Sequence, residues 1–231
     1  MLGPALMEKE TVIDKMIEGS LVYAIVSTEG RSDYGDLFAV YRQSAEDASG
    51  KEVWLREYTN DFAAVKPWKI DMGDMDGDGI REILIAVKKT TRLDKTEKNR
   101  MFIFNYDGER LVKKWTGSQT GGIWRDFFVA DMLKIPGDEL LFVEQGEDGG
   151  ERLSINYWFD FGFLRLAESD DFTDILDISV LGENRLRMTY DKEASRIISL
   201  KVMNGRIVED LAIENHQQRI NKEGSKAVRE D

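Results

Sequence analysis

Residues 71–87 read DMGDMDGDGIREILIAV, in which five carboxylates and three glycines accompany an apolar run. The run Ile83–Val87 is short and continuously apolar, which is typical of a buried strand. Before it, the alternating carboxylates of Asp74, Asp76 and Asp78 can converge inside a tight loop, and the glycine after them permits the sharp turn that such a loop needs. The stretch therefore predicts an acidic loop that leads directly into a buried strand.

The spacing of these carboxylates suits a bound cation. With Asp74 as position 1, Ile80 is position 7, where its carbonyl can point inward, and Glu82 is position 9. Ca²⁺ takes about six to eight such hard oxygen ligands. An EF-hand begins in the same way but needs a glutamate at position 12, where this chain has Ile85, and then a helix. The loop must instead feed a strand, so Glu82 closes the predicted shell. We predict that Ca²⁺ is held by Asp74, Asp76, Asp78, Ile80 and Glu82.

The composition indicates an all-β chain. Its 231 residues are 42% hydrophobic and 33% charged, which suits one mid-sized domain with a continuous core. Twenty glycines and only three prolines accompany short β-branched and aromatic runs, a pattern of many short strands. We predict strands that begin at Leu21, Leu37, Glu52, Glu82, Arg100, Arg110, Asp126, Glu139, Arg152, Asp174, Arg185, Arg196 and Arg206.

An internal repeat relates two parts of the chain. Aligning Asp74 with Asp131 also places Glu82 on Glu139, a shift of 57 residues in both cases, and the apolar runs that follow coincide. In the second loop, DMLKIPGDEL, the carboxylates of positions 3 and 5 are replaced by apolar residues. We therefore expect the second loop, from Asp131 to Glu139, to have lost its metal. The two replacing residues are Leu133 and Ile135.

Turn dipeptides mark four units along the chain. The Asp-Gly and Asn-Gly pairs among them are strong hairpin signals, because both central residues of a type I′ turn need positive φ. Four units of about four strands each match the blades of a β-propeller, whose inner strands should be continuously apolar. The expected fold is all-β and β-propeller-like, either a small ring or part of a larger one. The dipeptides are Ser49-Gly50, Asp107-Gly108, Phe161-Gly162 and Asn204-Gly205.

The two ends of the chain fall outside this pattern. Residues 1–19 contain ETVIDKMI, from Glu10, which fits either a strand or one face of a short helix. Residues 20–211 form the predicted propeller-like domain. LAIENH, from Leu211, is an alternative closing strand, and residues 212–231 are a polar tail that we expect to be a frayed helix or disordered.

The acidic loop and the strand after it resemble the FG-GAP or VCBS-type repeats of integrin-α-like β-propellers. The loop pattern of that family is D-x-D-x-D-G-x-x-D/E, followed by a short apolar strand. The resemblance is firm over about residues 62–166 and architectural elsewhere. It implies that the loop joins the first two strands of a blade and holds Ca²⁺, while ligands meet the opposite rim. The residues that match position by position are Asp74, Asp76, Asp78, Gly79 and Glu82.

Charge and cysteine content exclude several classes of function. A formal net charge of −12 disfavours nucleic acid, and the most basic stretch, Lys88–Arg100, lacks aromatic residues for base stacking. Without cysteine there is no disulfide, thiolate metal site or cysteine nucleophile. No stretch is long and apolar enough for a membrane span, and the start, MLGPALMEKE, lacks the apolar core of a signal peptide.

The calcium prediction bears on the compartment. A loop of modest affinity fills at extracellular calcium concentrations and would often stand empty in cytosol. We therefore expect an extracytoplasmic protein whose targeting segment is absent from this chain, and a cytoplasmic location is the alternative.

Enzymatic chemistry has little support in these residues. His216 is the only histidine and lies in the polar tail, so triad chemistry is disfavoured. A pair of carboxylates, as in glycoside hydrolysis, remains, with Asp126, Asp160 and Glu144 as candidates in a chain of 44 acidic residues. The glycine-rich Gly117–Gly122 lacks the Gly-Lys-Ser/Thr of a phosphate loop.

A binding function fits the pattern better. In propellers of this kind the loops between blades lie opposite the metal loops, so Thr116–Arg125 and Gly146–Glu151 are candidate recognition segments. Exposed aromatic residues flanked by glycines favour contacts with protein or sugar, unless both tryptophans belong to the core. We expect a calcium-stabilised module that binds a protein or polysaccharide without catalysis of its own; the alternative is a carboxylate-dependent carbohydrate-active enzyme. The predicted recognition surface consists of Trp115, Gln119, Trp124 and Arg125.

Overall fold

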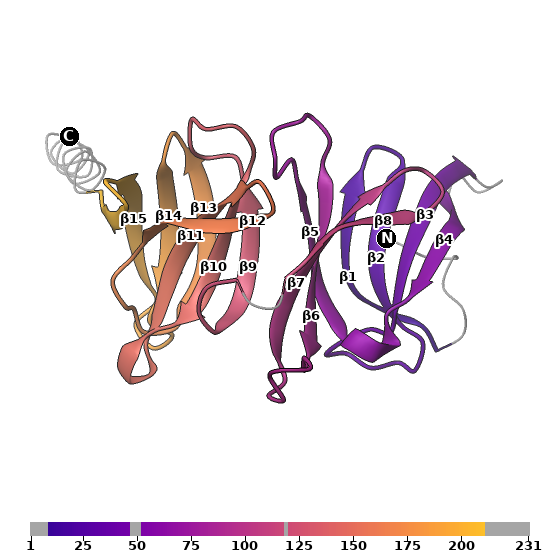
Figure 1. Ribbon diagram of the computed structural model, residues 1–231, viewed down its shortest axis with the longest axis horizontal. Coiled ribbons are helices and arrows are strands. Elements are labelled where there is room, and N and C mark those ends of the chain that lie inside the picture. Colours follow the sequence, from indigo (N-terminus) through magenta and orange to yellow (C-terminus); the bar gives the residue numbers. More distant parts are fainter. Residues whose placement is uncertain (1–8, 47–51, 118–119, 211–231) are drawn as a thin grey trace, which may run out of the picture. The chain divides into compact units, whose positions relative to one another are not determined.

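The computed structural model describes residues 9–46, 52–117 and 120–210. These residues form sixteen strands and two short 3-10 turns, with no α-helix among them (Figure 1). The all-β class predicted from composition is therefore confirmed for the described part of the chain. Nothing in that part is a helix of the length and apolarity needed to cross a bilayer.

The strands group in fours along the chain, and within each group consecutive strands are hydrogen-bonded neighbours. The first group comprises β1 (Thr11–Glu18), β2 (Leu21–Ser27), β3 (Leu37–Glu46) and β4 (Glu52–Asp61). After the turn η1 (Ala63–Val65), the second comprises β5 (Pro67–Gly73), β6 (Glu82–Lys89), β7 (Lys98–Tyr106) and β8 (Leu111–Thr116). The third comprises β9 (Trp124–Ala130), β10 (Glu139–Gln145), β11 (Glu151–Phe159) and β12 (Gly162–Glu168), with η2 (Glu147–Gly149) after β10. The fourth comprises β13 (Ile175–Gly182), β14 (Arg185–Tyr190), β15 (Arg196–Met203) and β16 (Arg206–Glu209).

Sheet pairing does not divide the strands into the four separate blades that were predicted. The first and second groups are each a four-stranded sheet, whereas the third and fourth belong to one eight-stranded sheet. They are joined because β12 and β16, the last strands of their groups, pair in parallel at Glu168 and Arg206. The spacing of turns in the sequence predicted the grouping of strands in fours. Nothing in the sequence predicted that the last strands of two groups would pair with each other.

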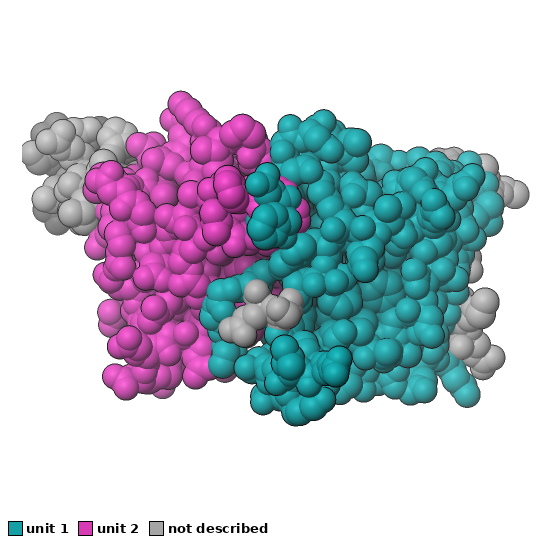
Figure 2. All heavy atoms as spheres, in the orientation of Figure 1, with its two compact units in different colours: residues 1–123, 160–162 teal, residues 124–159, 163–231 magenta. Residues whose placement is uncertain are grey.

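The described chain divides into two compact units, coloured separately in Figure 2. Unit 1 comprises residues 1–123 and 160–162, and unit 2 comprises residues 124–159 and 163–231. Both lie largely within the single domain expected over residues 20–211.

Unit 1 is held together by apolar side chains from both of its sheets. β2 and β6 are buried along almost their whole length, as expected of inner strands with an apolar residue at nearly every position. The backbone N–H of Gly35, before β3, donates to the carbonyl of Pro67 in β5 at 2.7 Å, which ties the two sheets together. The buried core shared by the sheets consists of Tyr23, Ile25, Phe38, Val40, Phe62, Ile70, Met72, Ile83, Ile85, Val87 and Phe104.

Unit 2 has its own core between the two halves of its sheet. β10 is buried on both faces, but β14 alternates, with Leu186 and Met188 buried while Arg185 and Arg187 are exposed. The fourth group therefore buries one face within the unit. The core consists of Met132, Leu141, Val143, Leu153, Ile155, Ala167, Ile175, Leu186, Met188, Leu200 and Ile207.

Three elements refine the strand predictions. ETVIDKMI, which fitted a strand or a helix, forms β1 and pairs antiparallel with β2. The sequence patterns did not predict β5 and β12, because the segments PWKIDMG and GFLRLAE interrupt their apolar residues with polar ones and begin with turn residues.

In the β15–β16 turn both Asn204 and Gly205 have positive φ, as the type I′ prediction requires. Ser49-Gly50, Leu211 and the predicted tail lie outside the described residues.

Candidate metal centre

The acidic loop joins β5 to β6, the first two strands of the second group (Figure 1). Its far end is anchored firmly, because β6 begins at the buried Glu82 and continues as an apolar strand. The loop itself is largely exposed, with Asp74 half-buried and Asp76 and Asp78 exposed. A polar loop therefore leads directly into a buried strand, as the sequence predicts.

Backbone groups wind the loop around Asp74. Its Oδ1 accepts the N–H of Asp78 at 3.0 Å and its Oδ2 accepts the N–H of Gly79 at 2.8 Å. Gly79 has a φ of +86°, a left-handed conformation that other residues adopt at a cost. Asp78 in turn accepts the N–H of Ile80 at 2.8 Å. These bonds fix the loop without using the Asp76 carboxylate.

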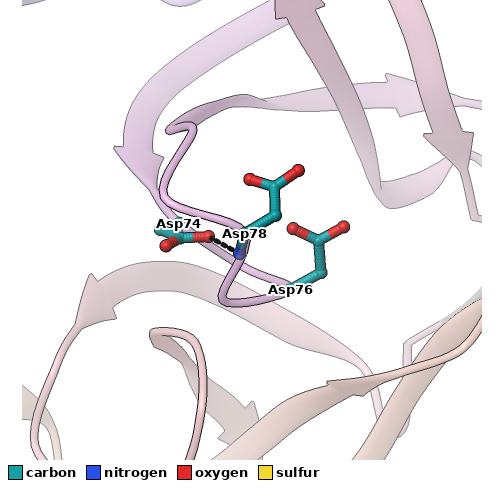
Figure 3. Close-up of side chains that lie close together, drawn as sticks. All are labelled: Asp74, Asp76 and Asp78. Atoms are coloured by element: carbon teal, nitrogen blue, oxygen red, sulfur yellow. Dashed lines mark hydrogen bonds between the residues drawn. The ribbon is translucent and has the colours of Figure 1, made fainter.

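The three aspartates each place one carboxylate oxygen within 4.8 Å of the others. In Figure 3 the carboxylates of Asp76 and Asp78 point to the same side of the loop, while that of Asp74 is turned toward the backbone nitrogen of Asp78. The donor set is entirely of hard oxygen atoms, which fits Ca²⁺ in kind and is poor for softer transition metals. Three aspartates fall short of the number of ligands that Ca²⁺ takes, so backbone and water oxygens would have to complete the shell.

Glu82, predicted to close that shell, is fully buried and already engaged by protein donors. Its Oε2 accepts the backbone N–H of Met75 at 2.8 Å. Its Oε1 accepts the Asn105 side-chain amide at 3.1 Å and the Lys114 ammonium at 2.7 Å. The same ammonium also pairs with Oδ2 of Asp76. Glu82 is therefore a clamp on the loop, and the role of metal ligand remains a prediction for it, as for the carbonyl of Ile80.

The second loop keeps the clamp and lacks the acidic cluster. Oε2 of Glu139 accepts the N–H of Met132 at 3.0 Å, the bond equivalent to Glu82–Met75 under the 57-residue shift, and that of Leu133 at 3.2 Å. Its Oε1 is buried without a hydrogen-bond partner. Burial, together with the nearby Asp131 carboxylate, raises the pKa of Glu139 to about 6, although the backbone N–H groups lower it. The sequence repeat therefore corresponds to the same hydrogen bond in both loops, from a backbone N–H to the glutamate that begins the next strand.

The predicted recognition residues are not all available for contact. Trp124 is 3% exposed and packs against Phe127 and Phe142, so its ring belongs to the core. Trp115 is half-buried, and its ring lies so close to Gly117 that a Cβ there would be 2.0 Å away. Gln119 lies outside the described residues.

Arg125, the fourth predicted recognition residue, is half-exposed and paired. Its guanidinium binds both carboxylate oxygens of Glu151, the second at 2.7 Å, and the carbonyl of Ile175. The pKa of Arg125 is raised chiefly by its hydrogen bond to Glu151. This residue therefore ties β9 to the start of β11 and of β13.

Two of the three candidate catalytic carboxylates have structural partners, and the third, Asp160, is an exposed turn residue with positive φ. Glu144 is 3% exposed, and both of its oxygens accept from Arg165 at 2.6 Å while Oε1 also accepts from Ser154 at 2.8 Å. Asp126 accepts the N–H of Phe127 at 2.9 Å. The oxygens of Glu144 are thus occupied by protein donors in a charge-assisted pair. His216 lies outside the described residues.

Sequence reasoning missed Lys114 and Asn105, the two side chains that reach Glu82 from other strands. Lys114 lies in RLVKKW, a run of mixed polar and apolar residues, and no spacing relates it to the loop.

Comparison of the chain with models of known protein families finds no match, and comparison with curated proteins finds no similar sequence.

Proposed function

We propose that this protein is a calcium-stabilised, β-propeller-like binding module of the FG-GAP or VCBS type, without catalysis of its own. The observation that carries the proposal is the cluster of Asp74, Asp76 and Asp78, whose oxygens lie within 4.8 Å of one another. The cluster lies between the first two strands of a four-stranded group, the place that the resemblance assigns to a calcium loop.

Electrostatics supports a cation at this loop. Carboxylates held this close repel one another, so a positive charge among them is favourable, and Lys114 places an ammonium beside Asp76. Asp74 and Asp78 accept backbone N–H groups, which orient their carboxylates. A divalent ion would supply that charge, with water completing its shell.

Thermal melting with calcium and with chelator tests the metal. Because Ca²⁺ would bind the folded loop alone, a concentration of about 100 Kd should stabilise the fold by roughly 2.7 kcal/mol. Asp76→Ala should abolish the calcium-dependent rise in Tm, whereas Asp131→Ala, at the equivalent second loop, should leave it intact. An unchanged Tm of the wild-type protein at millimolar calcium would refute the calcium assignment.

A hollow in unit 1 supports a ligand-binding role. Its volume is about 280 Å³, and its lining combines the aromatic residues Phe62, Phe102 and Phe104 with polar residues. The polar residues are Asn60, Asp61, Lys113 and Thr116. Its size suits one side chain of a protein partner or one sugar ring, and aromatic faces bind both. A glycan array and a pull-down, each with wild type and Phe102→Ala, would identify the ligand class. Retained binding by a folded Phe102→Ala variant would exclude the hollow as the site.

The carboxylate-dependent enzyme is the weaker proposal because of Glu144. Its salt bridge with Arg165 occupies the most buried of the candidate acids, which makes that residue less available for catalysis.

We also propose an extracytoplasmic location, since calcium loops of modest affinity fill at calcium concentrations of about 10⁻⁴–10⁻³ M, which are typical of extracellular modules. Cytoplasmic retention of the full-length protein in a fractionation experiment would contradict this location.

A further inference from the structure

The side chain of Lys114 reaches the acidic loop from the opposite edge of its sheet. Lys114 lies on β8, the fourth strand, whereas the loop joins the first two. The β7–β8 pairing matches Ile103 with Trp115 and Phe104 with Lys113, so Lys114 is an extra residue at a shift of register. Such a bulge redirects a side chain relative to a regular strand. At this bulge, the ammonium of Lys114 bonds to Glu82 at 2.7 Å and to Asp76.

Both carboxylates that Lys114 contacts belong to the predicted metal shell, as positions 3 and 9. Glu82 is fully buried, and a buried carboxylate without a cationic partner is strongly destabilising. The Lys114 ammonium lies against both carboxylates, at 2.7 Å from Glu82 and in a salt bridge with Asp76. The lysine is therefore a cation that the fold itself supplies to the loop.

In the second loop, no lysine of the described residues pairs with the equivalent glutamate. Glu139 keeps the clamp on backbone N–H groups, but its Oε1 has no partner, and burial raises its pKa to about 6. Under the 57-residue shift, Oε1 of Glu82 is the equivalent atom, and Lys114 together with Asn105 occupies it. The lysine thus satisfies an oxygen that would otherwise be open to another cation.

We infer that Lys114 competes with Ca²⁺ for Asp76 and Glu82, and so sets the calcium concentration at which the loop fills. This inference rests on the calcium binding proposed above. An ammonium and a Ca²⁺ ion repel each other when they bind the same oxygen, so binding of the ion through these two oxygens is opposed by the lysine and favours its displacement. The affinity of the loop is lowered by the free energy of the lysine contacts, and its fold is preserved when calcium is scarce.

Isothermal titration of the decalcified full chain with CaCl₂ tests this competition. Lys114→Met removes the charge at nearly constant length, and Lys114→Gln keeps a hydrogen-bond donor for Glu82, which protects folding in the absence of metal. Both variants should bind Ca²⁺ roughly tenfold more tightly than wild type, a typical coupling between two sites. Lys95→Met removes one charge from an exposed residue of unit 1 and should leave the affinity unchanged.

Thermal melting provides a second readout. Without calcium both Lys114 variants should melt below wild type, and calcium should raise their Tm by more than it raises that of wild type. Tight binding by the variants with none by wild type would support the competition and refute calcium stabilisation of the natural protein. Equal affinities for wild type and both variants would overturn the competition and leave the calcium site standing. An absence of binding in all of them would refute both proposals.

Discussion

At the scale of single residues, the two equivalent glutamates show how one buried charge can be handled in two ways. Glu82 and Glu139 each start an inner strand and each accept a backbone N–H from the second residue of the preceding loop. Glu82 is compensated by the ammonium of Lys114. The second oxygen of Glu139 has no partner among the described residues, and the pKa of its carboxyl is raised to about 6. Its negative charge is therefore avoided by binding a proton.

Glu139→Gln should therefore stabilise the protein above pH 6. Because the folded state raises the pKa from 4.5 to about 6, this group favours folding fully below pH 4.5, and that contribution is lost as the pH rises through 6. Glutamine keeps an oxygen for the two backbone N–H groups and never ionises. At pH 8 the variant should exceed wild type by about 2 kcal/mol in the free energy of unfolding, measured by urea denaturation.

The same comparison at pH 5 separates ionisation from packing. There the carboxyl is largely protonated in the folded state but already mostly ionised in the unfolded state, so the advantage of the variant should fall to less than half of its value at pH 8. Glu109→Gln, at an exposed turn position, is the control and should change stability little at either pH. A gain by Glu139→Gln that is the same at pH 5 and pH 8 would show that the effect does not arise from the charge.

At the scale of elements, local pattern predicts strands well and their partners poorly. β6, β10 and β14 begin at the predicted residues Glu82, Glu139 and Arg185, because the local pattern of apolar residues agrees there with burial in the fold. Of the candidate site, the convergence of the three aspartates follows from their alternation in one loop. The contacts of Lys114 and the pairing of β12 with β16 depend on residues distant in sequence, and no local pattern encodes them.

The β2–β3 connection provides a test of such a non-local contact. A Cβ on Gly35 would lie 2.6 Å from the carbonyl oxygen of Val26 and 2.6 Å from the Ile25 side chain. Gly35→Ala should therefore destabilise the protein by about 1–3 kcal/mol, because backbone must move. Gly162→Ala, where no atom lies within 4 Å of the added carbon, should be neutral or slightly stabilising. Chemical denaturation measures both; equal effects would mean that the loop accommodates the methyl group freely.

At the scale of the whole molecule, the described chain contains two units with separate cores. Ile85 is fully buried in the core of unit 1, and Leu141 is fully buried in that of unit 2. The sequence suggested one continuous core, because composition reports how much apolar surface is present and not how it is divided. The division matters for the proposed metal, since the acidic loop and its lysine both belong to unit 1.

Leu141→Ala should weaken unit 2 selectively. Removing a fully buried leucine leaves a cavity that costs about 2–5 kcal/mol, and the neighbours that lose contact are those of the unit 2 core. Amide hydrogen exchange should therefore accelerate in β9–β16 more than in β1–β8, as expected when stability differs between cooperative units. Ile85→Ala should give the opposite pattern, and calcium should slow exchange in unit 1 of that variant. If either substitution accelerates exchange equally in both units, they unfold as one body, and calcium bound to the acidic loop would then protect the whole molecule.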